Sequence, residues 1–103
     1  MAVLAIDAGT TGVTALVIDR DGRTIARAYS EFEQHFPQPG WVEHDPEQIW
    51  QATLKAAKSA GVEQLEISCI GITNQRETAV VWDRQTLKSP TKAIVWQDRR
   101  TSI

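Results

Sequence analysis

The stretch AVLAIDAGTTGVTALVID, residues 2–19, decides the fold because it contains two strand-like segments joined by a turn of small residues. Residues 2–7 are apolar without interruption until Asp7, which is typical of a central strand covered on both faces. Residues 13–19 predict a second strand, and the turn before it places the carboxylate of Asp7 where the first strand ends. This pair predicts the centre of a sheet.

Later segments extend this pair into a mixed sheet. Asp21 and Gly22 suit a tight hairpin turn, and residues 24–32 then predict a third strand that completes an antiparallel meander of three strands. Residues 65–73 are again almost continuously apolar, so they predict a second buried strand that lies parallel to the first after a crossover connection. The expected fold class is therefore α/β, with a mixed sheet and a crossover helix.

The crossover helix has clear start and stop signals. Asp45 is a suitable N-cap because its side chain can accept an otherwise unpaired backbone N–H, and Pro46 at the first helical position has no N–H to leave unpaired. Gly61 supplies the C-terminal stop. Residues at helical spacing predict one buried face, made of Ile49, Trp50, Thr53, Leu54 and Ala57.

Two segments carry weaker signals. Residues 33–44 contain two prolines and no hydrophobic period, so we expect an ordered loop in which His35 and His44 are surface residues. Neither histidine has the cysteine or carboxylate neighbours that a zinc site requires. Residues 78–83 and 92–97 predict two further short strands around a turn.

Composition and charge exclude several function classes. With 103 residues the chain forms at most one domain, and its net charge of -2 provides no basic field to attract nucleic acid or anionic lipid. No apolar segment reaches the roughly 18–20 residues of a membrane span and no leader pattern precedes the first strand, so a cytoplasmic location is expected. The single cysteine, Cys69, has apolar neighbours and is expected to be a buried structural thiol. A small molecule or another protein is the expected partner.

The turn DAGTTG, Asp7 to Gly12, has the residues of a phosphate and magnesium site. Gly9 lets the backbone approach a ligand closely, the two threonines offer hydroxyls beside N–H groups, and Asp7 can hold a hydrated cation facing the same anion. No Gly-Lys-Ser/Thr follows, so this is not a Walker loop. The alternative is an ordinary hairpin turn, which the residue types alone favour more strongly.

The segment NQRET, residues 74–78, places charge directly after a strand expected to be buried. Arg76 beside Glu77 offers the donors and acceptors that a polyhydroxyl ligand needs, and the indole of Trp96 is a candidate to cover the carbon face of that ligand. The alternative, equally favoured by spacing, is a solvated ion pair with Trp96 as a core residue. The polyhydroxyl interpretation requires that the segment and the Asp7 turn converge on one cleft.

Four segments together resemble, in order and spacing, the N-terminal part of glycerol kinases within the FGGY carbohydrate kinase family. They are AIDAGTT (residues 5–11), PGWVEHDPEQIW (39–50), IGITNQRET (70–78) and AIVWQDRRT (93–101). The first is shared by many sugar kinases, whereas the other three point to the glycerol branch. The resemblance extends from about Val3 to Thr101.

The resemblance implies an actin-like, ribonuclease-H-like ATPase domain, of which residues 1–103 would be the N-terminal part, with the remainder of that domain and a C-terminal domain absent. It implies ATP and Mg²⁺, and ATP-dependent phosphorylation of glycerol to glycerol 3-phosphate by the full-length protein. The aspartate that should accept the hydroxyl proton is expected beyond Ile103, so no catalytic residue is assigned within this chain. The chain ends without a helix cap or polar tail, and such a piece alone is expected to be inactive.

The resemblance also assigns roles to individual residues. Positions that match the nucleotide-phosphate hairpin are Gly9, Thr10, Thr11, Gly12 and Thr14, Asp7 matches a carboxylate near the magnesium, and Arg76, Glu77 and Trp96 match the glycerol pocket. Thr14 stands where the family hairpin usually has an arginine that reaches toward phosphate, and Ala8 replaces a common glutamine. The alternatives are therefore an FGGY kinase for another polyol or a ketose and, in a different class, a non-catalytic phosphate-binding or structural module. Homo-oligomer formation by the full-length protein stays open.

Overall fold

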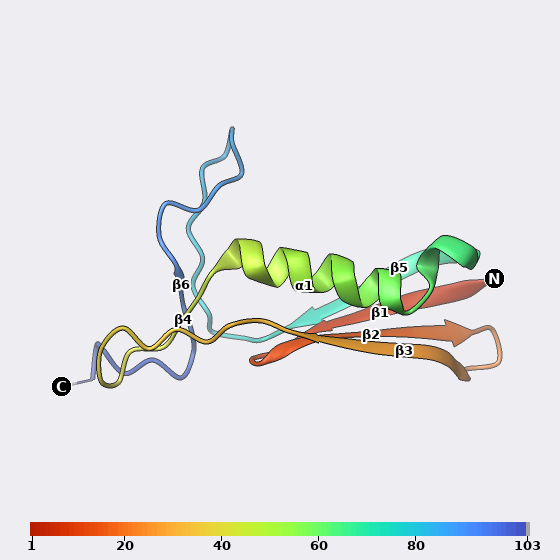
Figure 1. Cartoon of the computed structure of the whole chain (residues 1–103), viewed down its shortest axis with the longest axis horizontal. Coiled ribbons are helices and arrows are strands. Elements are labelled where there is room, and N and C mark those ends of the chain that lie inside the picture. The colour runs from red at the N-terminus through yellow and green to blue at the C-terminus, as the bar shows by residue number, and fades with distance from the viewer. Residues whose placement is uncertain (103) are drawn as a thin grey trace.

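The computed structural model describes residues 1–102 as an α/β fold in which a helix packs on one face of a four-stranded sheet (Figure 1). Strands β1 (Ala2–Ala8), β2 (Gly12–Asp19) and β3 (Thr24–Glu31) form an antiparallel meander. Strand β5 (Ile67–Asn74) then pairs parallel to β1, which gives the strand order β3-β2-β1-β5. The predicted meander, crossover and returning parallel strand are confirmed.

A second, two-stranded sheet lies beyond the end of the first (Figure 1). It pairs β4 (Glu43–His44) antiparallel with β6 (Ala93–Ile94), so the segment predicted as a loop contains a strand. The two longer strands predicted at residues 78–83 and 92–97 are wrong in extent, since only a single bridge, Ala79 to Ile94, joins them. After that bridge the chain leaves the sheet and turns at Asp83. The Asp83 carboxylate accepts the backbone N–H groups of Gln85 and Thr86.

Helix α1 (Pro46–Ser59) begins as its sequence predicts, because the Asp45 carboxylate accepts the N–H of Glu47 at 2.9 Å. It is followed by Gly61 at a φ of 86° and a short 3₁₀ helix, η1 (Val62–Gln64). The predicted buried face is confirmed in part, since Ile49 and Ala57 pack against the core, but Ala52 and Ala56 are its fully buried residues and Trp50 is 53% exposed. Two residues turn a helix by about 200°, which puts Trp50 opposite Ala52.

The core lies between α1 and the sheet. Its residues on β1 and β2 alternate along each strand, and they are Ala2, Leu4, Ile6, Val13, Ala15 and Val17. Because the alternate residues point away from the helix, β1 is covered on one face only within residues 1–102, and the predicted burial on both faces is wrong. On each buried strand the packing therefore follows the period of two that a half-covered sheet requires.

Strand β5 is exposed in the described chain, although its apolar sequence predicted burial. Ile70 and Ile72 are 58% and 73% exposed, because α1 packs on β1, β2 and β3 and leaves the end of the sheet uncovered. Cys69 on the same strand is exposed for this reason, so the predicted buried thiol is wrong. An apolar sequence indicates that a strand is suited to burial and does not say which segment covers it.

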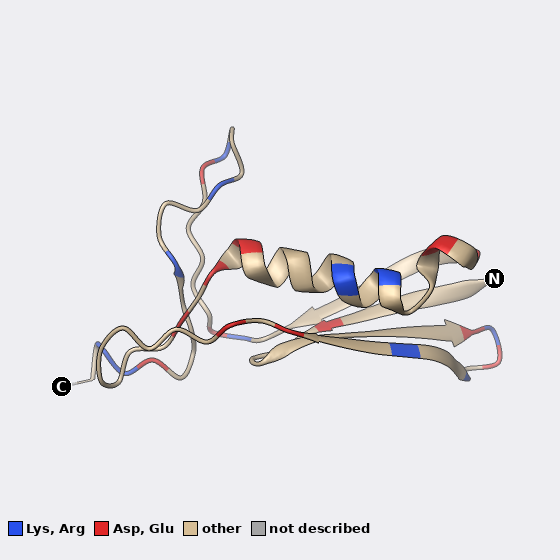
Figure 2. Cartoon of the chain, viewed as in Figure 1, with Lys and Arg blue, Asp and Glu red and all other residues tan. Residues whose placement is uncertain are grey.

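Charged residues are distributed over all parts of the fold. Figure 2 shows acidic and basic residues on the helix, the strands and the loops alike. On α1 the acidic Glu47 lies in the first turn and the basic Lys58 in the last, an order that complements the helix dipole. Within residues 1–102 we find no helix long and apolar enough to cross a membrane.

Gly12 at the start of β2 is required by packing. A Cβ atom there would lie 2.5 Å from the Tyr29 hydroxyl oxygen and 2.7 Å from the carbonyl oxygen of Ser30, both on β3. Such contacts are far inside van der Waals distance, so β2 and β3 could not keep their register with any side chain at this position. Gly71 on β5, by contrast, has no atom within 4 Å of an added Cβ among the described residues.

We therefore expect Gly12→Ala in the full-length protein to lower the free energy of unfolding by about 1–3 kcal/mol, the usual cost of overpacking. Asp21→Ala, in the exposed turn between β2 and β3, is the control and should have little effect, because the hydrogen bond of Asp21 uses its backbone N–H. Urea or thermal unfolding measures both variants. Equal losses for the two substitutions would contradict the steric argument.

Candidate functional site

The two candidate segments lie side by side at one edge of the sheet. Strands β1 and β5 run in the same direction and end together (Figure 1), with Ala8 in register with Asn74. The N–H of Gln75 donates to the carbonyl oxygen of Ala8 at 3.0 Å. The expectation that the turn after β1 and the segment after β5 converge is confirmed for the backbone, and we call them the 9–12 turn and the 75–78 segment.

The 9–12 turn is closed by one backbone bond and held by side chains from four other segments. The N–H of Gly9 donates to the carbonyl oxygen of Gly12 at 2.9 Å. The Thr10 carbonyl oxygen accepts from Gln34 at 3.0 Å, and its hydroxyl oxygen accepts from the indole of Trp96 at 3.0 Å. The Thr11 hydroxyl pairs with that of Tyr29 at 2.9 Å. The Thr10 hydroxyl keeps its own proton, so it can still donate to a ligand.

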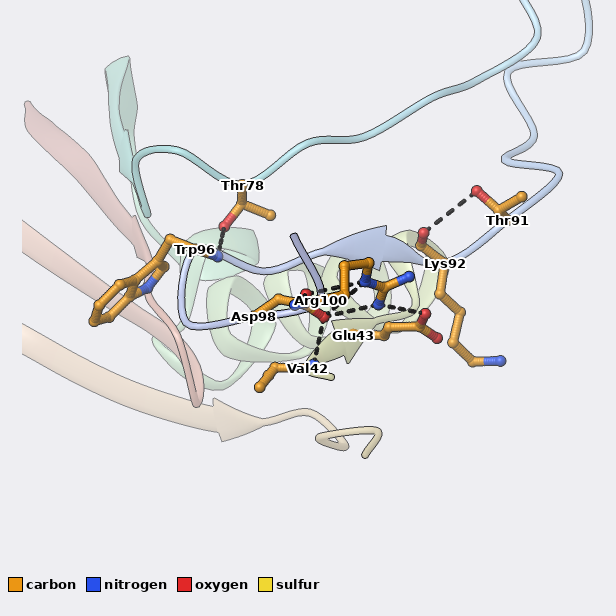
Figure 3. A network of polar contacts seen from close by, with 8 residues as sticks. All are labelled: Val42, Glu43, Thr78, Thr91, Lys92, Trp96, Asp98 and Arg100. Atoms are coloured by element: carbon orange, nitrogen blue, oxygen red, sulfur yellow. Dashed lines mark hydrogen bonds and ion pairs between the residues drawn. The ribbon is translucent and has the colours of Figure 1, made fainter. Parts of the chain in front are cut away.

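Trp96 joins the two segments and is 51% exposed, so its interpretation as a core residue is wrong. Its indole N–H reaches the 9–12 turn, while its backbone N–H donates to the Thr78 hydroxyl oxygen at 3.2 Å (Figure 3). The ring is thereby oriented at the junction of the two segments. An indole fixed by its polar edge leaves its faces free for apolar contact with a ligand.

Arg76 and Glu77 are exposed, and among residues 1–102 neither makes a hydrogen bond or an ion pair. The alternative interpretation as a solvated ion pair is therefore not supported. Glu77 has a φ of 61°, in the left-handed region that a residue with a Cβ seldom adopts. Gln75 supplies the attachment of this segment, since its side chain bonds the Gly9 carbonyl oxygen at 3.4 Å and the Thr78 hydroxyl at 2.9 Å.

Asp7 and Thr14 lie on the sheet face that points away from α1. Together with Thr73 and Arg27 they line an open hollow of about 480 Å³, whose apolar floor includes Leu16. Arg27 was missed in the sequence, although the pairing of Thr14 with Tyr29 puts residue 27 diagonally next to residue 14 on that face. The hollow combines a carboxylate, two hydroxyls and a guanidinium.

Asp7, which the sequence suggested as a magnesium ligand, has an accessible carboxylate. Its carboxylate is exposed at the end of β1. Its Oδ1 atom lies 4.0 Å from the place that a Cβ atom would take if Gly9 carried a side chain. The described residues contain no cluster of three or more acidic, histidine or cysteine side chains that could hold a metal by themselves. Mg²⁺ is commonly bound through one or two carboxylates, with waters and substrate phosphates completing its shell, so the single exposed carboxylate of Asp7 is compatible with such a site.

A second polar cluster fastens the segment that carries Trp96 (Figure 3). The Arg100 guanidinium bonds the Asp98 carboxylate at 2.7 Å and the Glu43 carboxylate at 2.8 Å, and it lies 3.8 Å from the centre of the Trp41 ring. Asp98 also accepts the N–H of Val42 at 2.7 Å. Hydrogen bonds from Arg100 hold the pKa of the Asp98 carboxyl well below its usual range. Sequence reasoning missed this cluster, because partners such as Glu43 and Arg100 are 57 residues apart.

The comparisons with known proteins agree with this geometry. The sequence model for the N-terminal domain of the FGGY family of carbohydrate kinases matches residues 2–103. The chain belongs to the FGGY family of carbohydrate kinases. Among curated FGGY relatives, a glycerol kinase of Rhizobium rhizogenes is 55% identical over 97% of this chain, and one of Haloferax volcanii is 53% identical over 95%. The chain spans about a fifth of the length of these relatives.

Solved FGGY structures confirm the fold. The glycerol kinase of Plasmodium falciparum with ADP superposes with a TM-score of 0.90 at 36% identity, over 96% of this chain and 21% of that one. A xyloylose kinase from Brucella ovis gives a TM-score of 0.90 at 30% identity, over 98% of this chain and 22% of that one. The predicted actin-like, ribonuclease-H-like fold is thereby confirmed.

We expect Arg100→Lys to loosen the segment that carries Trp96, because lysine cannot bond two carboxylates with a planar fork or stack on Trp41 in the same way. In the full-length protein the midpoint of thermal unfolding should fall. Since the pKa of Asp98 is lowered in the folded state, the stability that this carboxylate contributes is present at pH 7 and is lost only as the pH falls through the lowered pKa.

The neighbouring Arg99→Lys is the matched control for this prediction, because the bond of Arg99 to Gly40 uses the backbone N–H and survives the substitution. If Arg99→Lys lowers the midpoint as much as Arg100→Lys, the cluster does not have the assigned role.

Proposed function

We propose that the full-length protein transfers the γ-phosphoryl group of ATP to a terminal hydroxyl of glycerol, and that residues 1–103 supply part of the site. The observation that carries this proposal is the placement of the 9–12 turn beside the 75–78 segment at one sheet edge. The glycerol kinases among its relatives, at 51–55% identity, support the choice of glycerol. The rest of the domain and a second domain would follow these residues.

On the nucleotide side, this chain would hold phosphate oxygens with backbone N–H groups and hydroxyls. We assign this part to Gly9, Thr10, Thr11, Gly12 and Thr14. Asp7 would bind Mg²⁺, which when present neutralises charge on the transferring phosphoryl group. Gly12 has a second reason to be glycine, since Tyr29 occupies the space of a side chain.

On the acceptor side, Arg76 and Glu77 would bind the glycerol hydroxyls, and the Trp96 ring would cover its carbon chain. The exposure of Arg76 and Glu77 without partners in residues 1–102 supports this assignment, because their donors and acceptors remain available. Holding both substrates in line is the main contribution that a phosphotransferase makes to the rate. The proton acceptor is expected further along the chain, so residues 1–103 alone would be inactive.

The hollow beside Thr14 suggests how this chain manages without the arginine expected at that position. Arg27 on the adjacent strand lines the same hollow as Asp7 and Thr14, and its side chain makes no hydrogen bond or ion pair in residues 1–102. We assign its guanidinium to the nucleotide phosphates, since a charge with no internal partner beside this turn is available to an anion.

The activity is tested by ATP-dependent phosphorylation with the purified full-length protein, glycerol, a longer polyol and a ketopentose. Turnover of glycerol with the highest specificity constant is expected. Preference for the polyol or the ketopentose would make the protein an FGGY kinase for that substrate instead. Binding of ATP without turnover of any acceptor would favour the non-catalytic phosphate-binding module.

Arg76→Ala should lower kcat/KM for glycerol roughly ten- to a hundredfold, because it removes a charge-assisted hydrogen bond of about 1.5–3 kcal/mol. Arg84→Ala, an exposed arginine in the distant turn after residue 83, is the control and should leave kcat/KM unchanged. An unchanged constant for Arg76→Ala would remove Arg76 from the acceptor site.

Arg27→Ala should raise KM for ATP about tenfold by the loss of one charge-assisted contact, with little change in KM for glycerol. Arg23→Ala, in the turn that precedes the same strand, is its control. A rise in the glycerol KM alone would contradict the assignment of Arg27 to the nucleotide.

A further inference from the structure

A buried histidine connects the two candidate segments. His44 on β4 is 0% exposed, and its Nε2 lies 2.7 Å from Oε1 of Gln34 while its Nδ1 lies 3.1 Å from Nε2 of Gln75. Gln34 in turn bonds the carbonyl oxygen of Thr10 in the 9–12 turn at 3.0 Å. We call Gln34, His44 and Gln75 the His44 bridge. The sequence predicted a surface residue here, and that prediction is wrong because segments distant in sequence enclose this side chain.

The proton positions in the His44 bridge follow from its two ends. The amide N–H of Gln34 is used on the Thr10 carbonyl oxygen, so the Oε1 of Gln34 is the atom that accepts from His44. His44 therefore carries its proton on Nε2, and its Nδ1 accepts from the amide of Gln75. Only a neutral imidazole can donate on one side and accept on the other.

The hydrogen bonds continue into a closed ring, in which Trp96 donates on both sides and Thr10 accepts on both sides. The Oε1 of Gln75 accepts from the Thr78 hydroxyl at 2.9 Å, the Thr78 oxygen accepts from the backbone of Trp96, and the Trp96 indole donates to the Thr10 hydroxyl oxygen. Each donor in the ring thus meets an acceptor. The ring contains one residue of the 9–12 turn and two of the 75–78 segment, with His44 between them.

We propose that His44, as the neutral Nε2–H tautomer, is a positioning residue that fixes the 9–12 turn relative to the 75–78 segment. This inference rests on the proposed function, in which the first carries the phosphate contacts and the second the acceptor contacts. His44 would touch neither substrate. Its effect on phosphoryl transfer would come from the distance and angle between the two substrates, to which such reactions are very sensitive.

The surroundings of His44 support a neutral ring. The Phe32 ring packs against it in a T-shaped arrangement with centroids 4.7 Å apart, so one side is apolar. Burial, with a smaller contribution from His35, lowers the pKa of His44 below its ordinary value. A protonated ring would direct an N–H of Nδ1 at the amide N–H of Gln75, which opposes the bridge.

The proposal is tested in the full-length protein with His44→Phe, which keeps an aromatic ring and removes both hydrogen bonds. His35→Phe is the matched control, because His35 lies in the same segment and bonds Gln48 outside the bridge. We expect His44→Phe to lower kcat roughly ten- to a hundredfold under saturating ATP and glycerol, and His35→Phe to change it little. His44→Gln, whose amide can both donate and accept, should recover part of the loss.

Gln34→Leu is the sharper variant, since Gln34 contacts the 9–12 turn and no residue of the 75–78 segment. Positioning through His44 predicts that this substitution raises KM for glycerol as well as KM for ATP, by several-fold each. An effect on ATP alone, or a loss of thermal stability with both constants unchanged, overturns the proposal. This variant decides the question even if His44→Phe does not fold.

Failure of the proposed function is distinguishable from failure of this inference. If the wild-type protein does not phosphorylate glycerol, the activity assignment fails, and the same variants are then measured with the acceptor that is turned over. Nitrogen-15 NMR of the histidine rings reads the tautomer without any substrate. Protonation of His44 on Nδ1, or on both nitrogens at pH 7.5, overturns the bridge whatever the enzyme phosphorylates.

Discussion

The parallel pairing of β1 with β5 is the constraint on which the rest of this structure depends. Since both strands end at the same edge, the segments that follow them become neighbours although 66 residues separate Gly9 from Gln75. The crossover through α1 makes this pairing parallel, and the alanines of α1 that face the sheet keep the helix close to it. A shift of one residue in the register would turn Asp7 toward the helix and remove it from the candidate site.

Polar groups in this chain divide into those used inside the fold and those left for contact outside it. Within residues 1–102 every buried side-chain nitrogen or oxygen has a hydrogen-bond partner. The glutamines and the histidine of the 9–12 and 75–78 region belong to that internal group. Arg76 and Glu77 lie between internally bonded neighbours, Gln75 and Thr78, and remain exposed. Charged side chains without internal partners, carried by neighbours that are held by hydrogen bonds, are the arrangement that a preorganised site requires.

Sequence reasoning succeeded where the cause is local and failed where it is not. The Asp45 cap and the strand ending at Asp7 depend on a few adjacent residues, so they could be predicted. The burial of His44 and the exposure of Cys69 depend on which distant segments cover them, and no periodicity carries that information. The sequence pattern placed Trp50 on the buried face, whereas it is exposed. Alanines and a threonine occupy several positions of this helix, and because they differ little in hydrophobicity they do not mark one face clearly. The convergence of the 9–12 turn and the 75–78 segment could be predicted because both follow strand ends, whereas the hydrogen bonds that support them could not.

The exposed strand β5 has a consequence for how this protein is made. At the end of the four-stranded sheet in residues 1–102 it presents a row of backbone N–H and C=O groups, with Ile70 and Ile72 beside them. Such an edge readily accepts another strand, including one from a neighbouring molecule. During synthesis on the ribosome an uncovered edge of this kind favours aggregation unless another strand pairs with it quickly.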